Sequence, residues 1–266
     1  MYPFRYQRPG SLSEALQVLA ADTDAKVVAG GMTLIPSMKH RLAAPSQLLD
    51  INQLPELGGI TVSAEAVVVG AAVTHRMVAT SPPILQALPA LAALANGIGD
   101  PQVRVRGTLG GSLANNDPAA DYPSAVLALN ASVKTNSREI AADDFFQGMF
   151  TTALEPDELI LQVRFALPQR AAYAKFHHPA SGYAMTGVFV AQFKEGVRVA
   201  VTGAGNSVFR WTEAEAALDK SFTASALDGL AYPAEGLNAD MHAPAEYRAH
   251  LIQLMASRAV EQIEAN

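Results

Sequence analysis

Arg106-Gly-Thr-Leu-Gly-Gly-Ser-Leu113 is the stretch that decides how this 266-residue chain is interpreted, and Val27-Val-Ala-Gly-Gly-Met-Thr-Leu34 repeats its pattern about 80 residues earlier. Each places two consecutive glycines among apolar residues, with a hydroxyl residue within the next two positions. Glycine lets another group approach the main chain closely, and successive N–H groups at such a turn form an anion-binding nest. Together the turns could clamp a pyrophosphate without a lysine. Each could equally be an ordinary tight turn, and the residues alone leave that alternative open.

The residues around the first turn alternate between helix and strand. Ser11 and Glu14 match a capping box, which predicts that a short helix begins there. Residues 26–29 predict a buried strand, residues 32–41 a helix and residues 48–51 a second strand. The first fifty residues therefore predict a small unit that mixes helices and strands.

The residues around the second turn predict a larger mixed unit. The predicted elements are short strands at 59–62 and 66–70, mainly helical residues at 74–97, a polar loop at 113–121, a helix at 122–129 and a strand at 160–166. Pro168 ends this unit. We therefore predict a domain boundary near residues 168–173.

The C-terminal part has its own pattern. Residues 183–193 and 197–202 predict an antiparallel pair that turns at Glu195-Gly196. Thr212 with Glu215 matches a second capping box, and residues 244–264 repeat apolar side chains at helical spacing. This part therefore predicts a sheet accompanied by helices.

Composition excludes several classes of protein. The 25 acidic and 19 basic residues give a formal net charge of −6, which disfavours nucleic-acid binding. The chain has no cysteine, so it forms no disulfide and holds no ordinary iron–sulfur cluster. No secretory signal or transmembrane segment is recognised, because prolines interrupt the uncharged stretch at 77–99. We expect a cytoplasmic protein.

Common catalytic motifs are also missing from the sequence. It contains no P-loop, no His-Glu-x-x-His and no Gly-x-Ser-x-Gly, so ATPase, metalloprotease and serine-hydrolase chemistry is disfavoured. Asp117 and Asp121 follow the second glycine turn. Two interpretations stay open for them: capping of the loop, or a carboxylate that accepts hydrogen bonds from sugar or ribityl hydroxyl groups. We expect no metal ligands in this chain.

Three segments resemble the FAD-binding medium subunit of molybdenum hydroxylases. Val28-Ala-Gly-Gly-Met-Thr-Leu-Ile-Pro36, with Leu49-Asp-Ile51, is similar to the family's first flavin motif. Residues 98–121 resemble the second motif, and Pro179-Ala-Ser-Gly-Tyr-Ala184 resembles a third. The family includes the FAD subunits of carbon monoxide and nicotine dehydrogenases and the flavin domain of xanthine dehydrogenase. The resemblance spans essentially the whole chain.

The resemblance implies an α+β architecture. Residues 1–168 would form an FAD-binding domain of the p-cresol methylhydroxylase type, with α+β lobes at about 1–55 and 56–168. Residues 173–266 would form the C-terminal domain of carbon monoxide dehydrogenase flavoproteins, a three-stranded sheet with helices.

The resemblance also implies cofactor-binding residues. Around the pyrophosphate, Gly30, Gly31, Gly110 and Gly111 would supply backbone N–H groups and Thr33, Thr108 and Ser112 hydroxyl groups, flanked by Ala29, Met32 and Leu34. Asp121 would bind the polar portion of FAD, Ile98 and Ile160 would pack on the cofactor, Tyr183 would lie beside the isoalloxazine ring, and Lys175 would contact the cofactor. Met32 departs from the family pattern, where Gln or His is common, and removes a polar contact.

The function implied by the resemblance is that of a non-covalent FAD subunit without catalytic residues of its own. It would take electrons from two [2Fe–2S] clusters in a small subunit and pass them to an external acceptor. Molybdopterin would lie in a large subunit, and the complex would be a dimer of heterotrimers. The alternative is a self-contained flavin oxidoreductase of the same fold.

Overall fold

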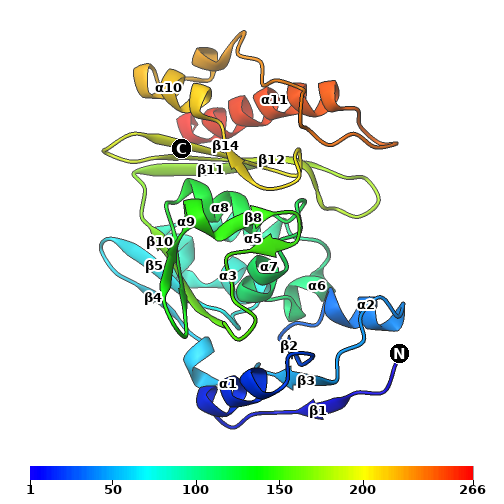
Figure 1. Cartoon of the computed structure of the whole chain (residues 1–266). Helices are drawn as coiled ribbons and strands as arrows, with labels where there is room; N and C mark the ends of the chain where they lie inside the picture. Colours follow the sequence, from blue (N-terminus) through cyan, green and yellow to red (C-terminus); the bar gives the residue numbers. More distant parts are fainter. Residues whose placement is uncertain (266) are drawn as a thin grey trace.

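The computed structural model describes residues 1–265 and stacks the chain in three layers, with the N-terminal lobe at the bottom of Figure 1 and the C-terminal unit at the top. Each layer contains one main β-sheet and at least two helices. The expected α+β organisation is therefore confirmed. Among residues 1–265, no helix is long and apolar enough to cross a membrane.

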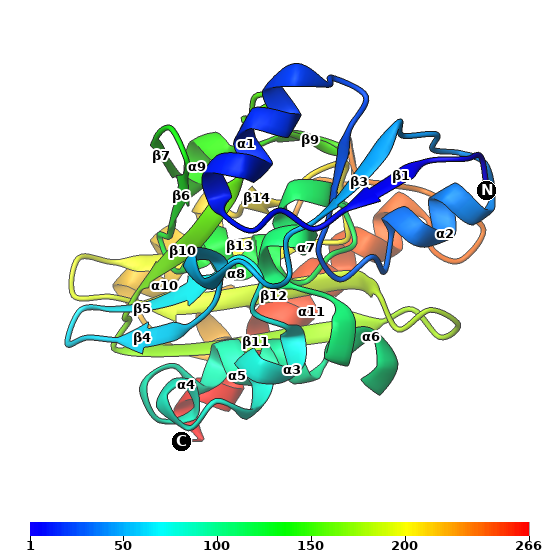
Figure 2. The ribbon, with the colours of Figure 1, turned by 90° about the horizontal axis from the view of Figure 1, so that it is seen from below.

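The N-terminal lobe has a three-stranded parallel sheet in the order β1-β3-β2. In Figure 2 it lies nearest the viewer. The Ser11 hydroxyl accepts from the Glu14 N–H at 3.2 Å, so the Ser11 cap of α1 is confirmed. The Glu14 carboxylate accepts from the Gly10 N–H at 2.7 Å and not from that of Ser11, so the second half of the predicted capping box does not form. The elements are β1 (Arg5–Gln7), α1 (Leu12–Ala21), β2 (Lys26–Val28), α2 (Leu34–Lys39), β3 (Gln47–Asp50) and the 3-10 turn η1 (Pro55–Leu57).

The middle lobe has a five-stranded antiparallel sheet in the order β4-β5-β10-β6-β7, with helices packed against it. A two-stranded sheet, β8-β9, lies beside them. The elements of the middle lobe are β4 (Ile60–Val62), β5 (Ala66–Gly70), α3 (His75–Thr80), α4 (Pro82–Ala87), α5 (Pro89–Asn96), α6 (Pro101–Arg106), α7 (Leu109–Asn115), α8 (Tyr122–Ala128), β6 (Ser132–Thr135), β7 (Glu139–Ala141), α9 (Ala142–Phe145), β8 (Phe146–Gly148), β9 (Thr151–Thr152) and β10 (Ile160–Ala166).

The C-terminal unit has an antiparallel sheet in the order β11-β12-β13-β14. Instead of three strands it has four, because residues after the expected hairpin fold back as a two-residue strand, β14, against β13. The elements are β11 (Arg170–His177), β12 (Ala184–Gln192), β13 (Val197–Thr202), β14 (Phe209–Arg210), α10 (Thr212–Lys220), the 3-10 turn η2 (Ala224–Leu227) and α11 (Ala245–Glu264).

The C-terminal sheet is buried on both faces, which fixes the C-terminal unit to the middle lobe. Val188 and Val190 of β12 belong to the core shared with α11, whereas Phe189 and Ala191 belong to the core of the middle lobe. The two-residue alternation of a strand produces this division. The sheet therefore acts as a wall between two cores.

The second predicted capping box is wrong. Trp211, not Thr212, precedes α10, and it makes no side-chain cap. The Glu215 carboxylate instead accepts from the Arg210 guanidinium at 2.6 Å and from the Val199 N–H at 2.9 Å. The Glu215 carboxylate therefore binds an arginine side chain and a strand N–H instead of capping α10. The local sequence pattern does not show that these two donors lie nearby.

Candidate cofactor site

The two glycine turns lie against each other. A Cβ atom built on Gly30 would lie only 2.7 Å from the Gly107 Cα and still closer to the Arg106 carbonyl oxygen. No side chain larger than hydrogen fits at Gly30 without moving the main chain of the second turn. At this point the main chain of the N-terminal lobe packs directly against the main chain of the middle lobe.

The first turn leaves its backbone donors without protein partners. Gly31 adopts φ +69°, a left-handed conformation that glycine adopts without strain. Across residues 1–265, no acceptor binds the N–H of Gly30, Gly31, Met32 or Thr33. Asn52 fixes the start of the turn, since its side-chain amide donates to the Ala29 carbonyl at 2.7 Å. Four successive amides are therefore held ready for an anion.

The second turn is different, because its backbone donors are already bonded. The Leu109 N–H donates to the Val73 carbonyl at 3.0 Å, and the Gly110 N–H donates to the Ala71 carbonyl at 2.9 Å. The Gly111 N–H donates to the Thr108 hydroxyl at 3.1 Å, which caps α7. The expectation that Gly110 and Gly111 offer their N–H groups to a phosphate is therefore not supported by this geometry. The contribution of Gly110 is its size, because a Cβ atom would lie 2.6 Å from that of Ala71.

The hydroxyl and apolar residues near the turns differ in accessibility. Ser112 is half-buried and Thr33 is exposed, so both hydroxyl groups are open to a ligand. Thr108 is 2% exposed and serves as the α7 cap. Met32 is 41% exposed, whereas Leu34 packs partly against the core that contains Met38. These positions remain predicted cofactor contacts.

His75 supports the second turn from inside the middle lobe. A Cβ atom on Gly107 would lie 2.6 Å from the His75 Nε2, and the backbone N–H of His75 donates to the Gly107 carbonyl at 2.9 Å. Within residues 1–265 the His75 Nδ1 and the neighbouring Tyr122 hydroxyl are buried without hydrogen-bond partners. Burial, and then the charge of Arg104, lowers the pKa of His75 to about 4. His75 is therefore neutral at pH 7. No motif surrounds His75 in the sequence, so the sequence gave no signal that it supports the second turn.

Asp121 lies in a buried polar cluster. Its Oδ1 accepts from the Tyr173 hydroxyl at 2.6 Å and lies 2.9 Å from the Lys175 Nζ. The Asp121 and Lys175 side chains are each 4% exposed. Burial raises the pKa of Asp121, while Lys175 and Tyr173 oppose that change. The structure thus brings Asp121 and Lys175 together and gives both of them protein partners.

The remaining predicted contacts lie at different depths. Ile160 is 5% exposed in the middle-lobe core, and Ile98 is half-buried against the same core. Tyr183 is 45% exposed, and partial burial, with the nearby carboxylates of Asp117 and Asp121, raises its pKa. Ile98 and Tyr183 can reach a ligand at the surface. Ile160 can contact such a ligand only through the small part of its surface that is exposed.

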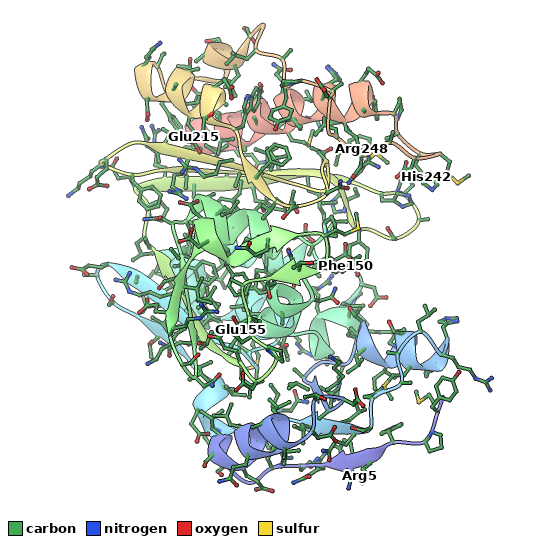
Figure 3. All side chains as sticks on the ribbon, viewed as in Figure 1. Arg5, Phe150, Glu155, Glu215, His242 and Arg248 are labelled. Carbon is green, nitrogen blue, oxygen red and sulfur yellow. The ribbon has the colours of Figure 1, made fainter. Side chains whose placement is uncertain are left out.

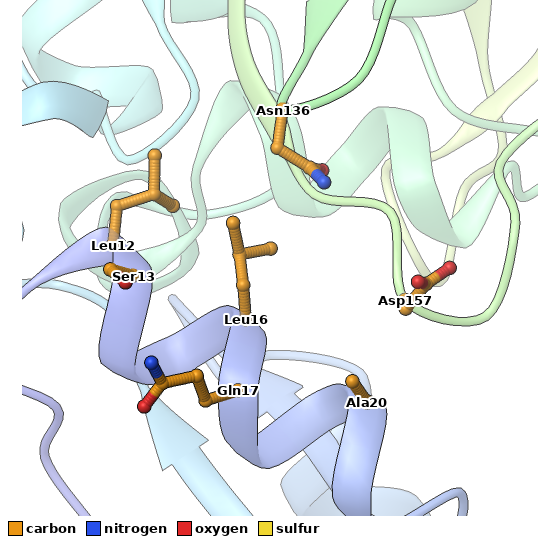
Figure 4. Close-up of a pocket in the computed structure, with 7 residues that line it drawn as sticks. All are labelled: Leu12, Ser13, Leu16, Gln17, Ala20, Asn136 and Asp157. Carbon is orange, nitrogen blue, oxygen red and sulfur yellow. The ribbon is translucent and has the colours of Figure 1, made fainter.

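Two cavities lie near these lobes. One, of about 480 Å³, is bordered by Tyr183, Phe150 and Arg248, and Figure 3 shows Phe150 and Arg248 on the same side of the molecule. The other, of about 470 Å³, lies between α1 and the loops that carry Asn136 and Asp157. Figure 4 shows no group of converging polar side chains in the second cavity. Neither cavity contains the glycine turns, and residues 1–265 contain no group of three residues arranged to hold a metal ion.

A family model and curated relatives match this chain. The model described as "FAD binding domain in molybdopterin dehydrogenase" matches residues 2–168. The nicotine 6-hydroxylase medium subunit of Paenarthrobacter nicotinovorans is 36% identical over 98% of this chain and 97% of its own length. The carbon monoxide dehydrogenase medium chain of Hydrogenophaga pseudoflava is 35% identical over 97% of this chain and 96% of its own length.

Solved structures show the same fold. Carbon monoxide dehydrogenase from Hydrogenophaga pseudoflava, in a form that lacks the Mo-pyranopterin moiety, matches with a TM-score of 0.89 at 35% identity. That match covers 100% of this chain and 99% of the other. The expected fold, an FAD-binding domain followed by a C-terminal sheet with helices, is therefore confirmed. The exact domain boundaries and the individual cofactor contacts stay predictions.

Proposed function

Because the chain belongs to the family of FAD-binding medium subunits of molybdenum hydroxylases, we propose that it holds FAD non-covalently at the paired glycine turns and works as an electron-transfer subunit. FAD, when bound, supplies the redox chemistry that connects one-electron donors with an external acceptor. The protein supplies binding and orientation.

The observation that carries the proposal is the contact between the two turns. Four backbone N–H groups at residues 30–33 have no acceptor among residues 1–265, and the first of these residues, Gly30, lies directly against the main chain of Arg106-Gly107. Gly30 and Gly31 are half-buried and Met32 and Thr33 are exposed, so these amides are accessible to water or to a ligand that can accept their hydrogen bonds. A pyrophosphate has the charge and the acceptor oxygens that such a nest binds. The residues present therefore fit FAD.

The proposed partners follow from the relatives. Two curated relatives are named as medium chains or subunits, and one solved relative lacks the Mo-pyranopterin part of its molybdenum cofactor. We propose a large molybdopterin subunit and a small [2Fe–2S] subunit as partners of this chain, assembled as a dimer of heterotrimers in the cytoplasm. Electrons would enter from the [2Fe–2S] clusters and leave to an external acceptor.

The purified protein tests the proposal directly. We expect oxidised-flavin absorption bands near roughly 375 and 450 nm, with the flavin released by denaturation because it is not covalently attached. Co-purification identifies the partner subunits. A colourless protein that binds ADP but not FAD would contradict the proposal, and substrate turnover by this chain alone would favour a self-contained oxidoreductase.

Replacing Gly111 with leucine is expected to lower FAD affinity about 10-fold, or about 1.4 kcal/mol. Gly111 is exposed in the first turn of α7, and a Cβ atom there would meet only the Thr108 hydroxyl, at 2.8 Å. The leucine side chain would therefore enter the proposed phosphate space, and its Cβ atom would displace only the Thr108 hydroxyl that caps α7. Titration of the apoprotein with FAD measures the change.

The matched control for this variant is Gly58→Leu. Gly58 is also exposed, and a Cβ atom there would meet only the Pro55 carbonyl, at 3.6 Å. We expect Gly58→Leu to bind FAD like the unchanged protein. If Gly111→Leu also binds FAD normally, the second turn does not hold the pyrophosphate.

A further inference from the structure

The Lys175 ammonium joins parts of the chain that are far apart in the sequence. Its Nζ donates to the Gly97 carbonyl at 2.8 Å and to the Gly182 carbonyl at 3.1 Å, and it lies 2.9 Å from the Asp121 Oδ1. A lysine ammonium has three N–H donors. All three are therefore directed at protein acceptors, and none is left for a cofactor.

Two of these acceptors immediately precede predicted cofactor contacts, of which Tyr183 is the one predicted to lie beside the flavin ring. Gly97, at the end of α5, is followed by Ile98, and Gly182 is followed by Tyr183. Ile98 belongs to the middle lobe, whereas Tyr183 belongs to the loop between β11 and β12 of the C-terminal unit. The same ammonium thus sets the position of both residues relative to each other.

The third acceptor makes this junction rigid. Asp121 begins α8, and its carboxylate is shared between Lys175 and the Tyr173 hydroxyl. A buried ion pair with fully satisfied hydrogen bonds resists rearrangement, because breaking it exposes a charge to an apolar interior. Lys175 and Asp121 are each 4% exposed, so water does not weaken the pair.

Resting on the function proposed above, we propose that Lys175 is a positioning residue for the flavin ring. It holds Ile98 and Tyr183 at a fixed separation and does not itself bind the cofactor. This role differs from the direct contact that the resemblance to the family implies for Lys175. It predicts that Lys175 affects the ring end of FAD and leaves the pyrophosphate end unchanged.

The experiment compares FAD with ADP, which carries the pyrophosphate but no ring. In Lys175→Met we expect ADP affinity to change less than about 3-fold. FAD affinity should fall about 10-fold, because Ile98 and Tyr183 would no longer be held in place and binding of the ring would have to order them. Flavin emission, quenched when a tyrosine lies beside the ring, should rise toward that of Tyr183→Phe. Lys134→Met, which removes an exposed lysine on β6, should change neither ligand.

A second variant guards against misfolding. Lys175→Met alone leaves the buried Asp121 carboxylate without its counter-charge, which destabilises proteins strongly. The double variant Lys175→Met/Asp121→Asn removes both charges and keeps an acceptor for Tyr173. We expect it to be folded and to show the same separation of FAD from ADP affinity.

The outcomes distinguish this inference from the proposed function. If the unchanged protein binds ADP but not FAD, the proposed function fails, and this inference fails with it. If the unchanged protein binds FAD but the variants lose ADP and FAD affinity equally, Lys175 acts at the pyrophosphate end. If the variants retain both affinities and the emission of the unchanged protein, Lys175 does not position the ring. Either of the last two results overturns the inference alone.

Discussion

Replacing Gly30 with alanine is expected to lower FAD affinity about 100-fold. The added Cβ atom would lie 2.7 Å from the Gly107 Cα, and the main chain that it meets cannot rotate away as a side chain can. Overpacking of this kind costs about 1–3 kcal/mol, and the upper end corresponds to about 100-fold in a binding constant. The strain falls on the contact between the two turns, so it separates the turns and leaves the packing of the hydrophobic cores unchanged. Isothermal titration with FAD measures the loss.

Gly58→Ala is the control for this prediction. It is the same substitution at an exposed glycine where a Cβ atom meets nothing closer than 3.6 Å. We expect its FAD affinity and the unfolding midpoint of its apoprotein to match those of the unchanged protein. Full FAD affinity in Gly30→Ala would show that the contact between the turns is not part of the cofactor site.

Acidification from pH 7.5 to pH 5.0 is expected to remove about 2 kcal/mol of stability through His75 alone. Its pKa is lowered from 6.5 to about 4 in the folded protein. Between these two values the unfolded chain binds more protons than the folded one, so stability is complete above pH 6.5 and falls as the pH drops toward 4. The structural reason is that the His75 Nδ1 is buried and has no hydrogen-bond partner among residues 1–265, so a proton there would place a charge in an apolar interior.

His75→Gln isolates this effect from the other titrating groups. The free energy of unfolding in urea is measured for both apoproteins at pH 7.5 and pH 5.0. We expect the unchanged protein to lose about 2 kcal/mol more than the variant over this interval. Equal losses would show that His75 is protonated in the folded state or does not titrate in this range.

The sequence predicted the features that depend on neighbouring residues. The Ser11 cap of α1, the strand at residues 160–166 and the hairpin that turns at Glu195-Gly196 all appear in the structure. Each depends on local turn chemistry or on apolar alternation. The closeness of the two glycine turns followed from the family resemblance and not from spacing.

The sequence did not predict which polar groups have partners. Residues 113–121 were expected to form a loop, but the first three of them complete α7, whose cap is Thr108. Two donors of the second turn, the N–H groups of Leu109 and Gly110, are taken by the carbonyls of Val73 and Ala71, which follow β5. Such pairings join segments that meet only in the folded chain. No local pattern contains them.

The polar cluster around Lys175 restricts how this protein can recombine with its relatives. The FAD-binding domain, as matched by the family model, ends at residue 168, yet the counter-charge of its Asp121 is Lys175 on β11. A chimera joined at that boundary inherits its carboxylate from one parent and its ammonium from the other. During evolution or engineering the two segments are therefore exchangeable only between parents that share this ion pair, so inheritance of the C-terminal unit is linked to that of the flavin module.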